Sequence, residues 1–192
     1  IIRVSPNYGT VGTPVTVSGN GYGYKERIEV NFGTIPTIAY ATSEKYGSWT
    51  VIYTIDHQPL GTKTITGYGL VTGISAVETF IINPKVEFVS PNHGTVGSSV
   101  YVEGDGYAGS ENVRINFGTS KTVFTQADKY GSFSTTFTVD TQGWGLTTIC
   151  ATGISSGTSS INFYTIETEI TLVSPTFGTV TTMITVKGNG FK

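Results

Sequence analysis

The sequence predicts an all-β protein made of tandem immunoglobulin-like β-sandwich domains. Short runs in which apolar and polar residues alternate recur along the chain of 192 residues, separated by Gly and Thr. No segment places apolar residues at the spacing of a helix over several turns. The same order of runs occurs twice and begins a third time, as expected for domains of one kind arranged in series.

The copies of the repeat begin 85 and then 84 residues apart. The segment 5–12, Ser-Pro-Asn-Tyr-Gly-Thr-Val-Gly, returns as segment 90–97 with one change and begins again at Ser174. A period of this length corresponds to one domain and not to one turn of a solenoid. We therefore expect a first domain over residues 1–84, a second over 85–168, and the first two strands of an incomplete third over 169–192.

About seven strands are expected in the first repeat, which is the number in an immunoglobulin-like sandwich. Val15 and Val17 alternate with Thr16, a pattern typical of a strand with one buried face. The expected strands cover residues 2–4, 15–17, 28–32, 37–41, 49–55, 63–68 and 77–82. The second repeat has apolar residues at matching positions, so the same strands are expected there.

The two full repeats differ in length by one residue. The difference lies between the Phe-Gly of residues 32–33 and the Tyr-Gly of residues 46–47, compared with residues 117–118 and 130–131. Because loops accept insertions more readily than strands do, this difference predicts a surface loop.

The third copy contains only two expected strands, and two strands cannot close a sandwich. Three explanations are open. The chain is cut from a longer parent, or the third copy packs on the second repeat, or it adds to a sheet edge of another molecule. We favour the first, because a finished chain normally avoids an open apolar edge.

A glycine-rich signature marks the start of each repeat. In the first repeat it is G-x-x-G-x-x-V-x-V-x-G-x-G-Y from Gly9, followed by V-x-F-G from Val30. Gly19 and Gly21 are expected to permit a positive φ or a bulge where the second strand leaves the sheet. This pattern resembles the IPT/TIG family of immunoglobulin-like domains, and the second halves of the repeats resemble those of bacterial and archaeal surface proteins. The resemblance implies a building module of an extracellular protein of the surface-layer (S-layer) or adhesin type.

Composition excludes several classes of function. The net charge is −2 and there is no basic stripe, so nucleic acid is not expected as a partner. No stretch approaches the ~20 apolar residues of a membrane span. Cys150 is the only cysteine, so no disulfide can form within the chain. His57 and His93 lie in different repeats, and no nucleophile–base pair can be assembled, so the chain is not expected to be an enzyme.

One recurring position suggests calcium. Asn20, Asp105 and Asn189 each stand between two glycines and precede an aromatic residue. Asp105, with Glu103 and Glu111, could supply oxygen ligands. The alternative is that an Asx residue tolerates the left-handed turn between the glycines. Because no D-x-D-x-D-G run occurs, the alternative is favoured and no cofactor is expected.

Trp144 is the candidate for binding carbohydrate. It stands between two glycines, where an exposed ring could stack on a sugar. Its counterpart in the first repeat is Leu60, which favours an apolar plug instead. Ser and Thr clusters such as residues 157–160 could carry O-linked glycans, although ordinary hydroxyls on a β-surface are favoured.

The sequence therefore predicts a non-enzymatic structural module of a large secreted or cell-surface protein. Its expected location is extracellular, at the cell surface or envelope, and its expected partners are neighbouring copies of the same protein or an extracellular ligand. The alternative is a carbohydrate-binding or spacer module of an extracellular polysaccharide-degrading enzyme. An exposed, coplanar row of aromatic side chains would favour that alternative.

Overall fold

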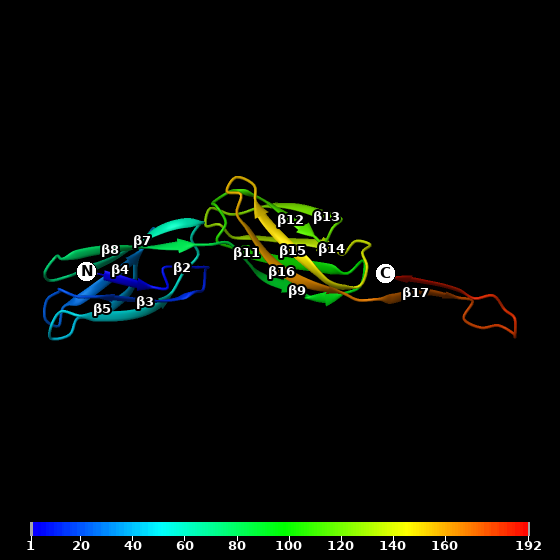
Figure 1. Ribbon diagram of the computed structural model, residues 1–192, viewed down its shortest axis with the longest axis horizontal. Helices are drawn as coiled ribbons and strands as arrows, with labels where there is room; N and C mark the ends of the chain where they lie inside the picture. The colour runs from blue at the N-terminus through cyan, green and yellow to red at the C-terminus, as the bar shows by residue number, and fades with distance from the viewer. Residues whose placement is uncertain (1, 192) are drawn as a thin grey trace. The chain divides into compact units, whose positions relative to one another are not determined.

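The computed structural model describes residues 2–191 (Figure 1) and contains only β-strands and their connections. The prediction of an all-β, immunoglobulin-like fold is confirmed. Two compact units are present. The first comprises Ile1–Lys85, Asp105–Gly109 and Lys129–Ser132, and the second comprises Val86–Gly104, Ser110–Asp128 and Phe133–Lys192. Within the described residues, no helix is long and apolar enough to cross a membrane.

Two sheets form the first unit. One has the strand order β1-β3-β6 and the other the order β2-β8-β7-β4-β5. The strands are β1 (Ile2–Ser5), β2 (Tyr8–Gly9), β3 (Pro14–Gly19), β4 (Arg27–Phe32), β5 (Ile35–Thr42), β6 (Trp49–Thr54), β7 (Gly61–Gly69) and β8 (Ser75–Ile82). Alternate residues of β3 and β4 are fully buried, as period-two patterning requires.

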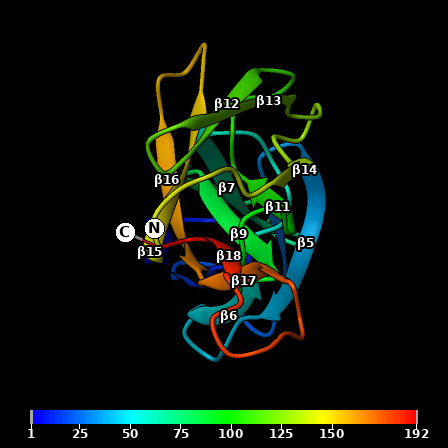
Figure 2. The same cartoon turned by 90° about the vertical axis from the view of Figure 1, so that its right-hand side faces the viewer.

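The second unit repeats this arrangement. Its two layers have the strand orders β14-β11-β9 and β10-β16-β15-β12-β13, and Figure 2 shows β12, β13 and β16 apart from β14, β11 and β9. The strands are β9 (Lys85–Ser90), β10 (His93–Gly94), β11 (Ser99–Asp105), β12 (Asn112–Phe117), β13 (Lys121–Gln126), β14 (Phe133–Thr138), β15 (Gly145–Gly153) and β16 (Ser159–Ile166). A separate pair, β17 (Glu169–Ser174) and β18 (Thr185–Asn189), completes the unit.

Apolar side chains from both sheets meet in each core. In the first unit the ring of Phe32 on β4 packs on that of Tyr53 on β6 at 6.2 Å, and in the second the ring of Phe117 on β12 packs on that of Phe137 on β14 at 5.2 Å. Burying one such side chain contributes about 1.5–3 kcal/mol. The two cores therefore rest on the same contact made at equivalent positions.

Two glycines near the end of β3 have different roles. Gly21 has a φ of +86°, as expected for a turn glycine. Gly19 instead makes room for the Trp49 indole, because a Cβ at Gly19 would lie 2.5 Å from its ring nitrogen. The same indole packs edge to face on Tyr22 at 5.7 Å. A positive φ therefore explains Gly21, and close side-chain approach explains Gly19.

The length difference between the repeats is not confined to a loop, so the prediction of a surface loop is wrong. The β4–β5 connection has two residues, 33–34, whereas the β12–β13 connection has three, 118–120. The extra length of the first repeat lies in β5, whose register with β4 shifts between Val30 and Phe32. The pairing of β12 with β13 is continuous. Thr37 lies in this bulge and has a φ of +56°, which is rare for a β-branched residue.

Candidate functional site

The three carboxylates proposed as calcium ligands serve different partners. Glu103 on β11 accepts a hydrogen bond from the hydroxyl of Tyr101, and Asp105 accepts one from Ser132. Glu111 is buried and accepts from Ser155 at 2.9 Å. No group of three or more His, Cys, Asp or Glu side chains that could hold a metal ion occurs in the part of the chain that the structure describes. The structure therefore does not bring Asp105, Glu103 and Glu111 together.

Glu26 and Glu111 are instead a matched pair of buried carboxylates, one in each full repeat. The Glu26 carboxylate accepts hydrogen bonds from the backbone N–H groups of Gly23 at 2.7 Å and Val71 at 2.8 Å, and from Thr72. Burial alone would raise the pKa of Glu26, but these hydrogen bonds to the charged form outweigh burial and lower the pKa. The carboxylate thus stays ionised and holds the turn between β7 and β8.

In the second repeat, Glu111 holds the turn between β15 and β16 in the same way but accepts from different donors. The hydroxyl of Ser156 lies 3.1 Å from one Glu111 oxygen, and the Ser156 backbone N–H lies 3.1 Å from the other. A Cβ at Gly69 or at Gly153 would lie 2.6 or 2.3 Å from the carboxylate of its repeat, so glycine is needed beside each. Hydrogen bonds from this many internal donors stabilise each buried acid in a fixed place in the fold.

Two glutamines stabilise the β4–β5 turn and its counterpart in the same manner. The Gln58 amide donates to the Phe32 carbonyl at 2.9 Å and accepts from the Thr34 N–H at 3.3 Å. Gln142 makes the equivalent bonds to Phe117 and Thr119, both at 3.3 Å. These polar groups are therefore structural as well.

Ser132, His57 and Asp105 lie together in the first unit and are the residue types of a catalytic triad. His57 Nδ1 is 3.0 Å from Asp105 Oδ1 and 3.3 Å from Ser132 Oγ, and Ser132 also donates to Asp105. In a triad, one ring nitrogen of the histidine faces the carboxylate and the other faces the nucleophile. Here one nitrogen faces both groups, and the serine proton is held by the carboxylate. The cluster does not have the geometry of a Ser-His-Asp triad.

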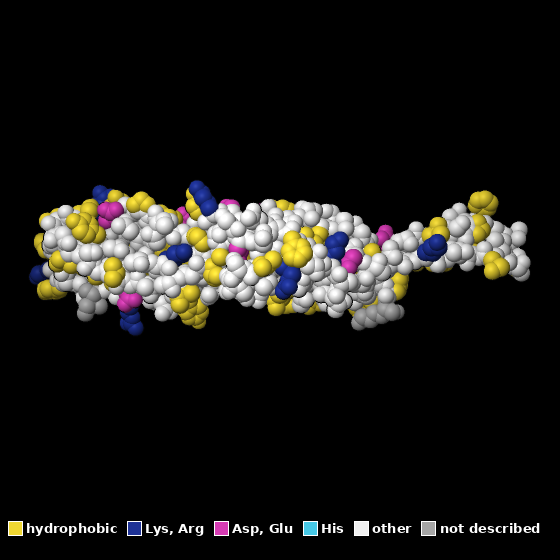
Figure 3. All heavy atoms as spheres, turned by 90° about the horizontal axis from the view of Figure 1, so that it is seen from above, with side chains coloured by type: hydrophobic (Ala, Val, Ile, Leu, Met, Phe, Trp, Pro, Cys, Tyr) yellow, Lys and Arg dark blue, Asp and Glu magenta, His cyan; other side chains and the backbone are white. Residues whose placement is uncertain are grey.

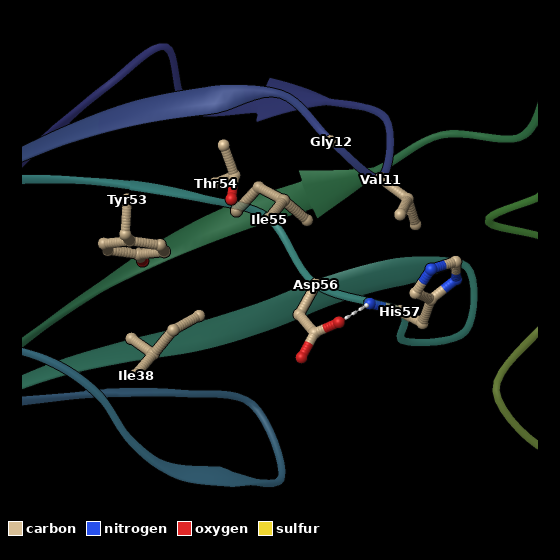
Figure 4. Close-up of a pocket in the computed structure, with 8 residues that line it drawn as sticks. All are labelled: Val11, Gly12, Ile38, Tyr53, Thr54, Ile55, Asp56 and His57. Carbon is tan, nitrogen blue, oxygen red and sulfur yellow. Dashed lines mark hydrogen bonds between the residues drawn. The ribbon is translucent and has the colours of Figure 1, made fainter.

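A hollow of about 440 Å³ opens beside this cluster (Figure 4). Tyr53, Ile38 and Asp56 line it, and Asp56 accepts a hydrogen bond from the His57 backbone N–H at 2.7 Å. The Tyr53 hydroxyl is buried without a hydrogen-bond partner among the described residues. Burial raises the pKa of Tyr53, so its phenolate is disfavoured and it is a poor nucleophile.

Trp144 precedes β15 and has 52% of its surface exposed, more than expected of an apolar plug. Its backbone N–H donates to the Gly190 carbonyl at 2.6 Å. His93, the other histidine, pairs with Glu167 at 3.1 Å. Cys150 is half-buried, with its Sγ 3.8 Å from the Thr152 hydroxyl.

An exposed row of side chains on the first unit was not predicted from the sequence. Tyr40 on β5, Glu29 on β4 and Tyr68 on β7 lie directly opposite one another in the register of the sheet. The tyrosines are 46% and 40% exposed. The Arg27 guanidinium stacks on the Tyr40 ring at 3.8 Å. We call Tyr40, Glu29 and Tyr68 the tyrosine row.

Comparison with known proteins gives structural neighbours only. No family model matches the chain, and no curated protein matches it in sequence. A C-terminal fragment of intimin, in complex with the intimin-binding domain of its translocated receptor, is 10% identical with a TM-score of 0.39. Invasin, a bacterial integrin-binding protein, is 14% identical with a TM-score of 0.40, and a biofilm-associated protein domain is 23% identical with a TM-score of 0.29.

The matches span most of this chain and a smaller share of the neighbours. They cover 92%, 91% and 83% of this chain for intimin, invasin and the biofilm-associated protein. The chain in turn spans 66%, 42% and 28% of those three proteins. By their names, intimin binds its translocated receptor and invasin binds integrin, and the arguments below depend on the residues of this chain.

Proposed function

We propose that the chain is a non-enzymatic structural module of a large secreted or cell-surface protein, of the surface-layer or adhesin type. We further propose that its repeating units are residues 1–84 and 85–168, with residues 169–192 beginning a third. Its role is mechanical: each repeat is a closed sandwich that resists unfolding and presents exposed sheet faces to neighbouring copies or to an extracellular ligand.

The observation that supports this proposal most directly is the use of the buried and half-buried polar side chains. Glu26, Glu111, Gln58 and Gln142 occupy equivalent places in the two repeats, and all four hold turns. An enzyme would place reactive groups in a cleft. In this chain, these polar side chains instead make hydrogen bonds that hold the same turns in both repeats. Charged side chains are also sparse on the face seen in Figure 3, and they make up 12% of the chain, about half the usual share.

Surface labelling of intact cells that make the protein tests the proposal. A membrane-impermeant amine reagent is expected to modify exposed lysines such as Lys45 and Lys129 before lysis, with a cytoplasmic protein as the unlabelled control. Mass spectrometry of the native polypeptide then gives the length of the parent chain. Labelling that occurs only after lysis would overturn the surface role.

The alternative is a carbohydrate-binding or spacer module of an extracellular polysaccharide-degrading enzyme. Trp144 is the residue whose exposure favours it. A catalytic domain in the same native polypeptide, together with loss of sugar binding in Trp144→Ala, would support that alternative over the scaffold.

A further inference from the structure

We propose that the tyrosine row of the first unit is a binding site for an extended, neutral, β-1,4-linked polysaccharide. This inference is independent of the mechanical role proposed above, because a scaffold module and an enzyme-linked module could both carry such a site. It also differs from the Trp144 site that the sequence suggested, since it lies on another repeat and on the outer face of a sheet.

The first argument is the spacing of the rings. Tyr40 and Tyr68 lie on β5 and β7, which flank β4, and both pair directly with Glu29. Neighbouring strands are about 4.8 Å apart, so the two tyrosines stand about 10 Å apart on one face. Alternate rings of an extended β-1,4-linked chain present their apolar faces at a similar interval. Two sugars at this spacing can therefore reach both tyrosines at once while the sugar between them lies over Glu29, and the sugar at Tyr40 meets the ring together with the Arg27 guanidinium that stacks on it.

The second argument is the chemistry around the rings. Glu29 is an acceptor for sugar hydroxyls, and Arg27, two residues away on the same face of β4, is a donor. The negative charge of Glu29 in the row is balanced by the neighbouring Arg27 outside it, so a charged ligand gains little from this surface. A neutral ligand rich in hydroxyls can use both groups. Tyrosine adds an apolar face and a polar tip, which suits a sugar.

The third argument is the strained residue beside the row. Thr37 has a φ of +56°, and this conformation costs a β-branched residue energy. Its hydroxyl donates to the Glu29 carboxylate, and its backbone N–H donates to Asn31 Oδ1 at 2.6 Å. The bulge thus orients the acid of the row and fixes the Asn31 amide with its oxygen toward the Thr37 N–H. Strain that fixes polar side chains before a ligand arrives is typical of binding sites.

The second repeat shows that the fold does not require this row. The equivalent register of β13, β12 and β15 places Phe124, Arg114 and Thr152 in line. There is no acid, no second ring and no bulge, and the β12–β13 pairing is continuous. If the row only stabilised the sheet, the two repeats would be expected to use similar residues. The difference supplies a matched control within one molecule.

Affinity gel electrophoresis of the whole 192-residue chain tests the proposal. Hydroxyethylcellulose and β-1,4-xylan in the gel are expected to retard the protein, and amylose, an α-linked and coiled polymer, is not. Tyr40→Ala and Tyr68→Ala should each weaken binding about tenfold, the loss of about 1.4 kcal/mol of ring contact. Tyr40→Phe should retain binding because the ring remains. Circular dichroism and thermal unfolding show whether each variant is folded.

Control variants separate the outcomes. Phe124→Ala, at the matching place in the second repeat, and Trp144→Ala should bind as the parent does. Loss of binding in Trp144→Ala with no change in the Tyr variants would overturn the proposal. So would equal retardation by amylose, binding of poly-lysine in place of the glycans, or no retardation by either β-linked polymer. None of these results depends on where the protein is located, so surface labelling and glycan binding can fail separately.

Discussion

The second repeat and the β17–β18 pair have the same apolar pattern but bury it to opposite extents. Val100 and Val102 are fully buried, whereas their counterparts Ile184 and Val186 are 61% and 58% exposed. Both segments have a neighbouring strand, because β17 pairs with β18 and β9 lies next to β11. Among the described residues, the strands β9 and β11 of the second repeat are accompanied by a five-stranded sheet, whereas β17 and β18 form a two-stranded sheet of their own. Alternation therefore decides which side chains share a face, and an opposing sheet is what removes that face from water.

Truncation of a core valine should show the largest difference between the two regions. Val102→Ala is expected to lower the free energy of unfolding by about 2–3 kcal/mol, from lost burial and the cavity left behind. Val186→Ala should change it by less than about 0.5 kcal/mol, because the side chain is already in water. Urea unfolding followed by tryptophan and tyrosine fluorescence measures both. Equal losses would mean that β18 is covered in solution, and the comparison would then fail.

Removal of the buried carboxylate should have the next largest effect. Glu111→Ala leaves the donors of Ser155 and Ser156 without their acceptor, at a cost of about 1–3 kcal/mol. Glu169→Ala, in the exposed strand β17, is the matched control and should be nearly neutral. Thermal unfolding of the two variants gives the comparison. If Glu111→Ala left the thermal stability unchanged, the turn would not depend on this acid.

Acid should weaken the first unit through Glu26. The pKa of Glu26 is lowered in the folded state, so its contribution is fully present above the ordinary glutamate pKa and is lost as the pH falls through the folded value. As the pH drops below the ordinary glutamate pKa, the urea midpoint of the parent chain should therefore fall more steeply than that of Glu26→Gln. Identical pH profiles in parent and variant would contradict the role of the ionised form.

A turn hydrogen bond common to both regions should show the smallest difference. The Ser98 hydroxyl accepts from the Thr95 N–H at 3.1 Å, and Thr182 accepts from Thr179 at 2.9 Å. Ser98→Ala should cost about 0.5–1 kcal/mol, because the turn joins strands of a packed domain. Thr182→Ala should cost less than half of that, since water replaces the lost bond at an exposed turn. Chemical denaturation of the single and double variants would show whether the two turns contribute independently.

Local pattern predicted the strands well where one face is buried. The alternation in residues 28–32 corresponds to β4, and the run 77–82 lies within β8. The two-residue strands β2 and β10 were missed because two residues are too few for a period to show. The bulge in β5 was missed for a different reason. The one-residue difference in length between the repeats combines a shorter turn with a longer strand, and only the register of strand pairing shows these two changes separately.

The candidate sites were less predictable than the fold. The sequence singled out Asp105, Glu103 and Glu111 because they are close along the chain, yet each binds a different partner. The sequence did not single out Tyr40 and Tyr68, which look like two isolated surface tyrosines. No local signal marks them as neighbours of Glu29.

The sequence by itself determined that the chain repeats, that each repeat is built from strands, and which side chains of a strand share a face. Those properties depend on residues two apart and on turn residues, so they can be read locally. The tertiary structure alone decided which of those faces are buried and which exposed residues line up. Burial needs a second sheet, and the alignment of Tyr68 with Glu29 and Tyr40 comes from backbone hydrogen bonds between strands distant in the chain.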